Sequence, residues 1–164
     1  MKKVVFLMSV LLSFVFCEKS FAQLNITAVI EEKPEKLLVG QVSYSWLYKT
    51  GTGNYEYWAR TDNQFDKHCT SLFLGNTPQT AVQTLKDLLS LMDNNVAIVN
   101  VQQVDGDISL QYASQLGVKM LWMKQDGQGG KSWISYPIVE KFIKYFKENF
   151  PNEFTNEEHQ YEAQ

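Results

Sequence analysis

Residues 42–58, VSYSWLYKTGTGNYEYW, constrain the fold more than any other stretch of the chain. Apolar and polar side chains alternate before and after a Gly-Thr-Gly sequence, which is the period-two pattern of paired β-strands. Glycine at the first position of a two-residue turn favours a type II′ hairpin centred on Gly51 and Thr52. That turn pairs Lys49 with Asn54 and sets the register for the rest of the hairpin.

This register predicts one aromatic face and one polar face for the hairpin. The aromatic face carries Tyr44, Trp46, Tyr48, Tyr55 and Tyr57. Trp58 falls on the opposite, more polar face, flanked by Glu56 and Arg60. Large contiguous apolar patches are seldom left in water, so we expect the aromatic face to pack against the helices that follow. The alternative is an aromatic platform exposed to solvent.

The remaining strands are predicted from short β-rich runs. They lie at 65–74, 96–101, 108–112, 118–123 and 131–136. The run at 96–101 is rich in β-branched residues and reads as a central strand. The last two strands are joined by a glycine-rich loop.

Two amphipathic helices are also predicted. Thr77 and Pro78 are typical of an N-cap and a first helical position. An apolar stripe follows at helical spacing and comprises Ala81, Val82, Leu85, Leu88, Leu89 and Met92. The second helix begins at Pro137 and ends before Pro151, and its apolar side carries Ile138, Phe142, Tyr145 and Phe146.

The order strands-helix-strands-helix, without regular β-α-β alternation, predicts an α+β fold. We expect a mostly antiparallel sheet of about six or seven strands, with the two amphipathic helices packed on one face. The order also suggests a duplicated unit of three strands and a helix.

The N-terminal segment has the three parts of a secretory signal peptide. Lys2 and Lys3 supply the positive charge, residues 4–17 form a short apolar run, and small residues precede the predicted cleavage after Ala22. The protein is therefore expected to be exported, to the bacterial periplasm or outside the cell. In the alternative, a lipid anchor is attached at Cys17.

Three segments follow from this reading of the chain. We predict a signal peptide at 1–22, a single α+β domain at 23–150 and a polar, acidic tail at 151–164. Removal of 22 of the 164 residues leaves 142, which is enough for one domain with a sizeable core.

The charge and hydropathy of the chain argue against nucleic-acid binding and against a membrane-spanning segment beyond Ala22. The chain has 15 Lys and Arg against 18 Asp and Glu, and loss of 1–22 takes its net charge from −3 to −5 because that segment carries two net positive charges. Such a chain is a poor nucleic-acid binder, since phosphate neutralisation needs clustered Lys or Arg. Beyond Ala22 no apolar run is long enough to cross a bilayer.

Disulfide, metal and cofactor chemistry have little support in the residues. Cleavage after Ala22 leaves Cys69 as the one cysteine, so no internal disulfide is expected. His68 and His159 form no ligand set with usable spacing, and no metal is predicted. The sequence DGQGGKS at 126–132 lacks the first glycine of a phosphate-binding loop and continues into a strand, so it is interpreted as a hairpin loop and no cofactor is expected.

The strongest catalytic candidates are Asp62, Asp66 and His68. Asp66 and His68 share one face of the predicted strand, and a carboxylate–imidazole pair can act as a general base. No nucleophile completes the pair, because Cys69 points to the face opposite His68. A surface pair at a strand edge is therefore the favoured interpretation, and no catalytic residue is assigned.

Trp58, Arg60 and Glu56 are the predicted binding residues. A tryptophan among polar and charged neighbours has the composition of a recognition hot spot. The competing interpretation is a small second core in which Ile26 and Val29 cover Trp58.

The residues together predict an exported, non-enzymatic binding protein whose partner is an unidentified protein. Two alternatives remain open. One is a small hydrolase or lyase that uses the carboxylate and imidazole groups named above. The other is a carbohydrate-binding module that uses surface aromatic residues.

Overall fold

The computed structural model describes residues 33–41, 44–63 and 68–154. All of them belong to one of the two compact units of the chain, which spans Glu31–Gln164. The predicted signal peptide at 1–22, Cys17, Asp66, and the tail beyond 154 lie outside the described residues.

The elements follow the predicted order. Sheet A contains β1 (Glu35–Val39), β2 (Ser45–Lys49), β3 (Tyr55–Arg60) and β4 (Cys69–Gly75), in that spatial order. Helix α2 (Pro78–Asp93) follows. Sheet B contains β5 (Ile98–Val101), β6 (Ile108–Gln115), β7 (Val118–Gln125) and β8 (Ser132–Ser135), again in chain order. Helix α3 (Tyr136–Asn149) and the short 3-10 helix η2 (Pro151–Glu153) complete the described chain.

The predicted α+β class, the antiparallel pairing and the order of elements are confirmed. The described strands form two four-stranded sheets rather than one sheet of about six or seven strands. Each sheet is followed by a helix, so the suggested duplication holds for the topology, with four strands in each unit. The run 96–101 was predicted to be a central strand, and this is wrong: β5 lies at the edge of sheet B, where Ile98 is 61% exposed.

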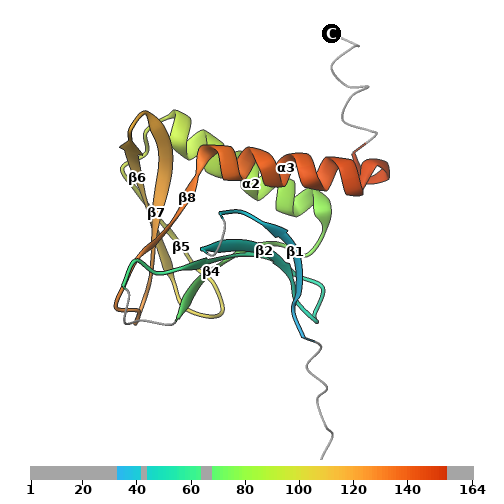
Figure 1. Ribbon diagram of the computed structural model, residues 1–164, viewed down its shortest axis with the longest axis horizontal. Coiled ribbons are helices and arrows are strands. Elements are labelled where there is room, and N and C mark those ends of the chain that lie inside the picture. The colour runs from blue at the N-terminus through green and yellow to red at the C-terminus, as the bar shows by residue number, and fades with distance from the viewer. Residues whose placement is uncertain (1–32, 42–43, 64–67, 155–164) are drawn as a thin grey trace, which may run out of the picture. The chain divides into compact units, whose positions relative to one another are not determined.

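The helices lie side by side over one face of sheet A, and sheet B stands at one end of that layer (Figure 1). Helix α2 contacts α3, β4 and β7, and α3 contacts β7 and β8. The core takes its largest fully buried side chains from both sheets and both helices: Leu47, Tyr57, Leu72, Leu74, Leu85, Met92, Ile108, Leu110, Leu121, Met123, Phe142 and Phe146. Each sheet therefore turns one face to the core and the other away from the helices.

Helix α2 begins where the sequence predicts. The Thr77 hydroxyl accepts from the Thr80 backbone N–H at 3.2 Å, and the Thr80 hydroxyl accepts from the Thr77 N–H at 3.1 Å. This reciprocal pair is a capping box that satisfies two backbone donors. Gly75 just before it has φ +154°, and a Cβ there would lie 2.8 Å from the Ala81 backbone nitrogen. Glycine is thus what allows β4 to end against the first turn of α2.

The loop of the β2–β3 hairpin differs from the predicted two-residue turn at Gly51 and Thr52. The Thr50 N–H donates to the Asn54 carbonyl at 2.8 Å, and the Gly53 N–H donates to the Thr50 carbonyl at 2.9 Å. The positive φ, +87°, occurs at Gly53. These bonds define a three-residue loop that ends on a left-handed glycine, a common hairpin type. The prediction was wrong because this sequence has glycine on both sides of Thr52, and either one can supply the positive φ.

The longer loop moves the register by one residue. Leu47 pairs with Tyr57, and Trp46 pairs with Trp58. Because side chains alternate along a strand, a shift of one residue changes which of them share a face. Tyr55 and Tyr57 are buried in the core, as expected, whereas Trp46 and Tyr48 lie on the outer face with Trp58.

The predicted five-membered aromatic face is therefore wrong. Only Tyr55 and Tyr57 pack under the helices, where their rings lie 5.0 Å from Phe146 and 5.8 Å from Phe142. Tyr44 is half-exposed, and its ring lies 6.3 Å from that of Trp133 in sheet B.

Aromatic rings also pack between α3 and the hairpin end of β3. Tyr55 lies 5.0 Å from Phe146 and 6.3 Å from Phe150, and Tyr145 lies 5.8 Å from Phe146. Burial, and to a smaller extent the nearby Tyr145, raises the pKa of Tyr55 above its ordinary value.

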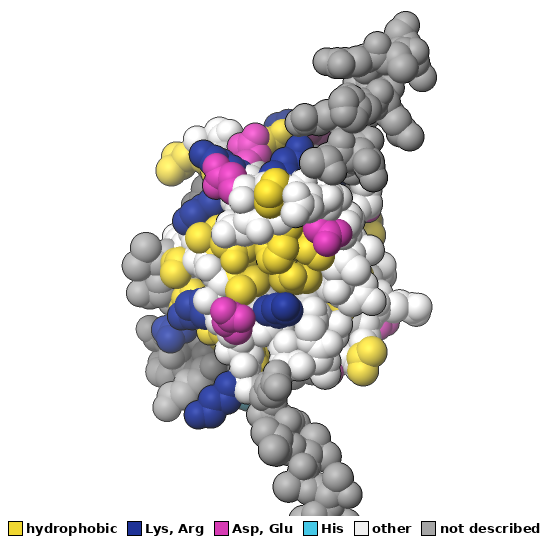
Figure 2. All heavy atoms as spheres, turned by 90° about the vertical axis from the view of Figure 1, so that its right-hand side faces the viewer, with side chains coloured by type: hydrophobic (Ala, Val, Ile, Leu, Met, Phe, Trp, Pro, Cys, Tyr) yellow, Lys and Arg dark blue, Asp and Glu magenta, His cyan; other side chains and the backbone are white. Residues whose placement is uncertain are grey.

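Figure 2 shows the right-hand side of Figure 1, where hydrophobic side chains gather and charged side chains surround them.

One hydrogen bond joins the two sheets through the core. The Tyr57 hydroxyl donates to the Trp133 backbone carbonyl at 2.7 Å, which links β3 to β8. Burial raises the pKa of Tyr57 far above its usual value, so the hydroxyl remains a donor at any ordinary pH.

Tyr57→Phe is expected to lower the free energy of unfolding by about 1 kcal/mol, because it removes the hydrogen bond from the Tyr57 hydroxyl to the Trp133 carbonyl. Urea denaturation followed by circular dichroism measures the change. Tyr48→Phe is the matched control, since it keeps a ring on the outer face of the same hairpin. Equal losses in the two variants would contradict the structural role of the Tyr57 hydroxyl.

Candidate functional site

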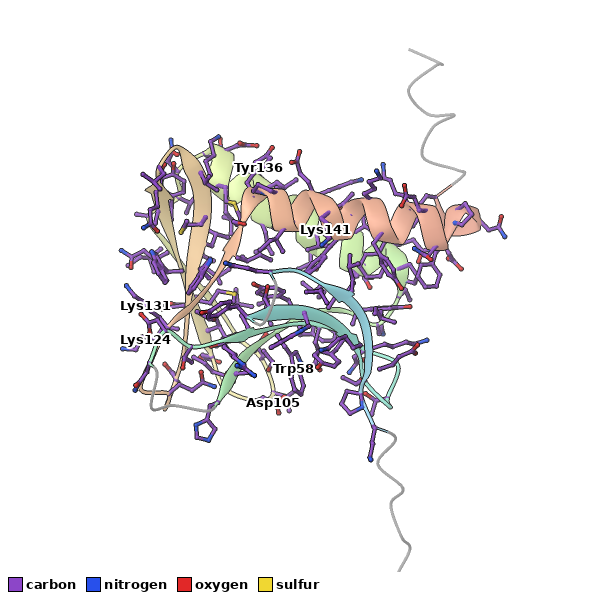
Figure 3. The ribbon with its side chains drawn as sticks, in the orientation of Figure 1. Trp58, Asp105, Lys124, Lys131, Tyr136 and Lys141 are labelled. Atoms are coloured by element: carbon purple, nitrogen blue, oxygen red, sulfur yellow. The ribbon has the colours of Figure 1, made fainter. Side chains whose placement is uncertain are left out.

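The outer face of sheet A carries three aromatic side chains from its central strands: Trp46, Tyr48 and Trp58, here called the aromatic face. Trp46 and Trp58 are direct cross-strand partners. The rings of Tyr48 and Trp58 lie 4.8 Å apart at an angle of 46°. All three side chains are partly exposed, and Trp58 lies on the side of the sheet away from the helices (Figure 3).

A charged side chain fixes the orientation of Trp58. The indole N–H of Trp58 donates to a carboxylate oxygen of Glu56 at 2.7 Å. Glu56 and Trp58 are two residues apart on β3 and therefore share a face. A hydrogen bond to an ionised acceptor is shorter and stronger than a neutral one, so it restrains the indole plane before any ligand arrives.

Two cations border the aromatic face. The Lys36 ammonium lies 4.7 Å from the centroid of Trp46 and 5.9 Å from that of Tyr48. The Arg60 guanidinium lies 5.6 Å from the centroid of Trp46. These distances are those of cation–π contacts, which hold both cations against the rings.

The structure brings the three predicted binding residues together. Glu56, Trp58 and Arg60 point from the same face of β3, and Glu56 binds Trp58 directly. Sequence reasoning missed Trp46, because the predicted register placed it on the opposite face. The correct signal was the second glycine of the loop, Gly53, which permits the longer turn. The competing second core under Ile26 and Val29 lies outside the described residues.

Strand β4, one edge of sheet A, is partly covered by the side chain of Gln103. Gln103, in the loop between β5 and β6, accepts from the Phe73 backbone N–H at 2.9 Å and donates to the Ser71 carbonyl at 2.9 Å. Its amide thus replaces a neighbouring strand along part of β4. An edge strand blocked in this way is a poor template for strand addition along that part of β4.

The catalytic candidates do not form a described site. The Asp62 carboxylate accepts from the Lys131 N–H at 2.9 Å, and the Asp62 N–H donates to the Lys131 carbonyl at 2.7 Å. Asp62 therefore fastens the β7–β8 loop to sheet A. Asp66 lies outside the described residues, and His68 is exposed. Within the described part of the chain, no group of three or more His, Cys, Asp or Glu side chains could hold a metal ion.

The glycine-rich segment 126–132 connects antiparallel β7 and β8 and is a hairpin loop, as predicted. Its Gln128 amide accepts from the Thr70 hydroxyl at 3.0 Å and donates to the Cys69 carbonyl at 3.2 Å. The loop is thus bonded to the start of β4.

A hollow of about 380 Å³ lies where the end of α2 meets the start of α3. The Lys119 ammonium lies 2.7 Å from a carboxylate oxygen of Asp93 and 5.8 Å from the centroid of Tyr136. The hydrogen bond to Asp93 raises the pKa of Lys119, so the amine is fully protonated at neutral pH. A charged lysine of this kind is a binding group rather than a nucleophile.

The chain matches no protein-family model, no curated protein and no solved structure. In the described residues, every helix is too short or too polar to traverse a bilayer. The case for a function therefore depends on the side chains described above.

Gln103→Ala is expected to accelerate hydrogen exchange of the Phe73 amide about fivefold, the equivalent of about 1 kcal/mol, because that amide loses its acceptor. Hydrogen–deuterium exchange followed by NMR measures the rate. Gln102→Ala, at the exposed neighbouring position, is the control. Unchanged exchange at Phe73 in Gln103→Ala, or equal acceleration in both variants, would show that the edge is closed in another way.

Proposed function

We propose that the protein is an exported, non-enzymatic binding protein that recognises a protein partner through the aromatic face of sheet A. The observation that carries this proposal is the position of Trp58. It stands on a sheet face away from the helices, 4.8 Å from Tyr48 and hydrogen-bonded to Glu56 at 2.7 Å. A partly exposed tryptophan that is already held in one orientation loses little freedom on binding.

The composition of the face supports a protein partner. Tryptophan, tyrosine and arginine are the residue types enriched at interface hot spots. Trp46, Tyr48 and Trp58 form the centre, and Arg60 lies at the rim. Phe73, which is 45% exposed, extends the apolar surface on the neighbouring strand β4.

The charges of the face indicate the chemistry of the partner. Lys36 and Arg60 are exposed and border the rings, whereas the nearest carboxylate, Glu56, is bonded to Trp58. A partner with an apolar centre and acidic side chains around it complements this arrangement.

The exported location rests on the N-terminal sequence. The two lysines, the apolar run and the small residues before the predicted cleavage after Ala22 occur in the order that signal peptidase substrates have.

Trp58→Ala is expected to weaken binding of the partner at least about tenfold while leaving the fold intact. The exported protein is immobilised and exposed to native envelope and culture extracts, and retained proteins are identified by mass spectrometry. A partner found in this way is then purified, and its Kd for wild type and variant is measured by calorimetry.

Trp122→Ala is the matched control, because Trp122 is also paired with a tryptophan across two strands, on the other sheet. If the partner binds Trp58→Ala and Trp122→Ala with equal affinity, the aromatic face is not its binding site. If Trp58→Ala loses as much thermal stability as binding, in free-energy terms, Trp58 belongs to the core and not to a binding surface.

A further inference from the structure

Each of the two sheets has two edge strands, and on three of these four edges a side chain bonds the backbone. On β4 this side chain is Gln103, as described above. On β8 the Trp133 carbonyl accepts from the Tyr57 hydroxyl, and on β1 the Val39 carbonyl accepts from the Lys141 ammonium at 2.7 Å. An edge without such contacts presents unpaired N–H and C=O groups, to which another strand can add.

Strand β5 is the fourth edge, and within the described part of the chain no side chain bonds its backbone in this way. Among the described elements, β5 packs extensively only against β6. The Asp126 N–H donates to the Asp107 carbonyl at 3.0 Å, so the odd-numbered residues of β6 direct their backbone groups to β7. The even-numbered residues of β6 bond to the odd-numbered residues of β5. The N–H and C=O groups of Ile98 and Asn100 therefore point outward.

The side chains of the β5 edge are uncharged. Ile98 is 61% exposed, and Asn100 is exposed on the same face of the strand. Neither β5 nor β6 contains a charged residue or a proline. The nearest carboxylates along the chain, Asp93 and Asp105, lie beyond the two ends of β5. The strand thus lacks the charges and prolines by which many natural edge strands avoid pairing.

The length of β5 limits the strength of a contact at this edge. Its four residues span about 13 Å, so strand pairing supplies only a few hydrogen bonds. Such a contact is smaller than the about 800 Å² per partner that a stable complex buries. Pairing at β5 is therefore expected to be weak and to depend on protein concentration.

We propose that the protein forms a weak homodimer in which β5 pairs antiparallel with β5 of a second copy. The pairing joins the two copies of sheet B into one continuous sheet. About the two-fold axis, Ile98 lies opposite Ile98 of the second copy, so each exposed isoleucine covers the other. Because Ile98 directs its backbone groups outward, this central pair exchanges two hydrogen bonds.

The charge of the chain favours a second copy at this edge. The net charge is −3, so two copies repel each other where charged surfaces meet. Repulsion is least where both surfaces are neutral, as they are when β5 meets β5. The dimer does not depend on the proposed protein partner, because the aromatic face lies on the other sheet.

Sedimentation velocity of the exported protein measures the dimer between about 20 µM and about 1 mM, a range that brackets weak association. The dimer fraction is expected to rise across this range. Ile98→Lys is expected to weaken dimerisation at least about tenfold, because it places two ammonium groups directly opposite each other. Asn100→Pro removes an outward N–H that the monomer does not use, and it is also expected to prevent pairing.

Val104→Lys is the matched control for Ile98→Lys. Val104 is 102% exposed in the loop between β5 and β6, so its replacement removes an exposed apolar side chain and adds the same charge outside the strand. This variant is expected to dimerise like the wild type. Circular dichroism verifies that all three variants are folded.

Amide hydrogen exchange measured by NMR locates the contact. When about two-thirds of the chains are dimeric, exchange of the Ile98 and Asn100 amides is expected to slow about threefold relative to dilute protein. The Phe73 amide, which Gln103 bonds within one chain, is expected to exchange at the same rate at both concentrations.

Three results would overturn the proposal. A protein that stays monomeric at about 1 mM does not pair through β5. Equal weakening by Ile98→Lys and Val104→Lys shows that overall charge controls association. A dimer in which the Ile98 and Asn100 amides exchange as fast as in dilute protein is held together by another surface.

Discussion

The pairing of Leu47 with Tyr57 is the constraint on which the rest of the structure depends. It places Tyr57 under α3, against Phe142, and lets its hydroxyl reach the Trp133 carbonyl of the other sheet. The same pairing puts Trp46 opposite Trp58 on the outer face. A slip of one residue would exchange these environments, since strand side chains alternate between faces. The core and the candidate binding surface are therefore fixed by one hairpin register.

The four tryptophans of the chain have a common arrangement. They form two cross-strand pairs, Trp46 with Trp58 and Trp122 with Trp133, and each pair lies on the sheet face turned away from the helices. The largest fully buried side chains are leucine, methionine, isoleucine, phenylalanine and Tyr57 instead. Cross-strand aromatic pairs stabilise a sheet even where they remain partly in water. Their surroundings differ: the indole of Trp58 donates to Glu56 on sheet A, whereas the cross-strand neighbour of Trp122 on sheet B is Gln111.

The sequence predicted those parts of the fold that depend on local chemistry. The start of α2 follows from Thr77 and Pro78, whose capping and φ preferences act within one turn. The division of the strands into two sheets could not be predicted, because it depends on which distant faces pack together, as β3 and β8 do through Tyr57. The site was predicted in part. Spacing along β3 places Glu56 and Arg60 on the same face as Trp58. Predicting that Trp46 is the cross-strand neighbour of Trp58 requires the correct length of the hairpin loop.

The most direct test of the register is the nuclear Overhauser effect between the Hα atoms of Leu47 and Tyr57. The Arg60 N–H donates to the Tyr44 carbonyl at 2.8 Å, and alternation from that pair makes Leu47 and Tyr57 a non-hydrogen-bonded pair. The Cα atoms of such a pair are about 4.5 Å apart, so a strong Hα–Hα effect is predicted. A strong effect between Trp46 and Tyr57 instead would place those two side chains on one face and contradict the account.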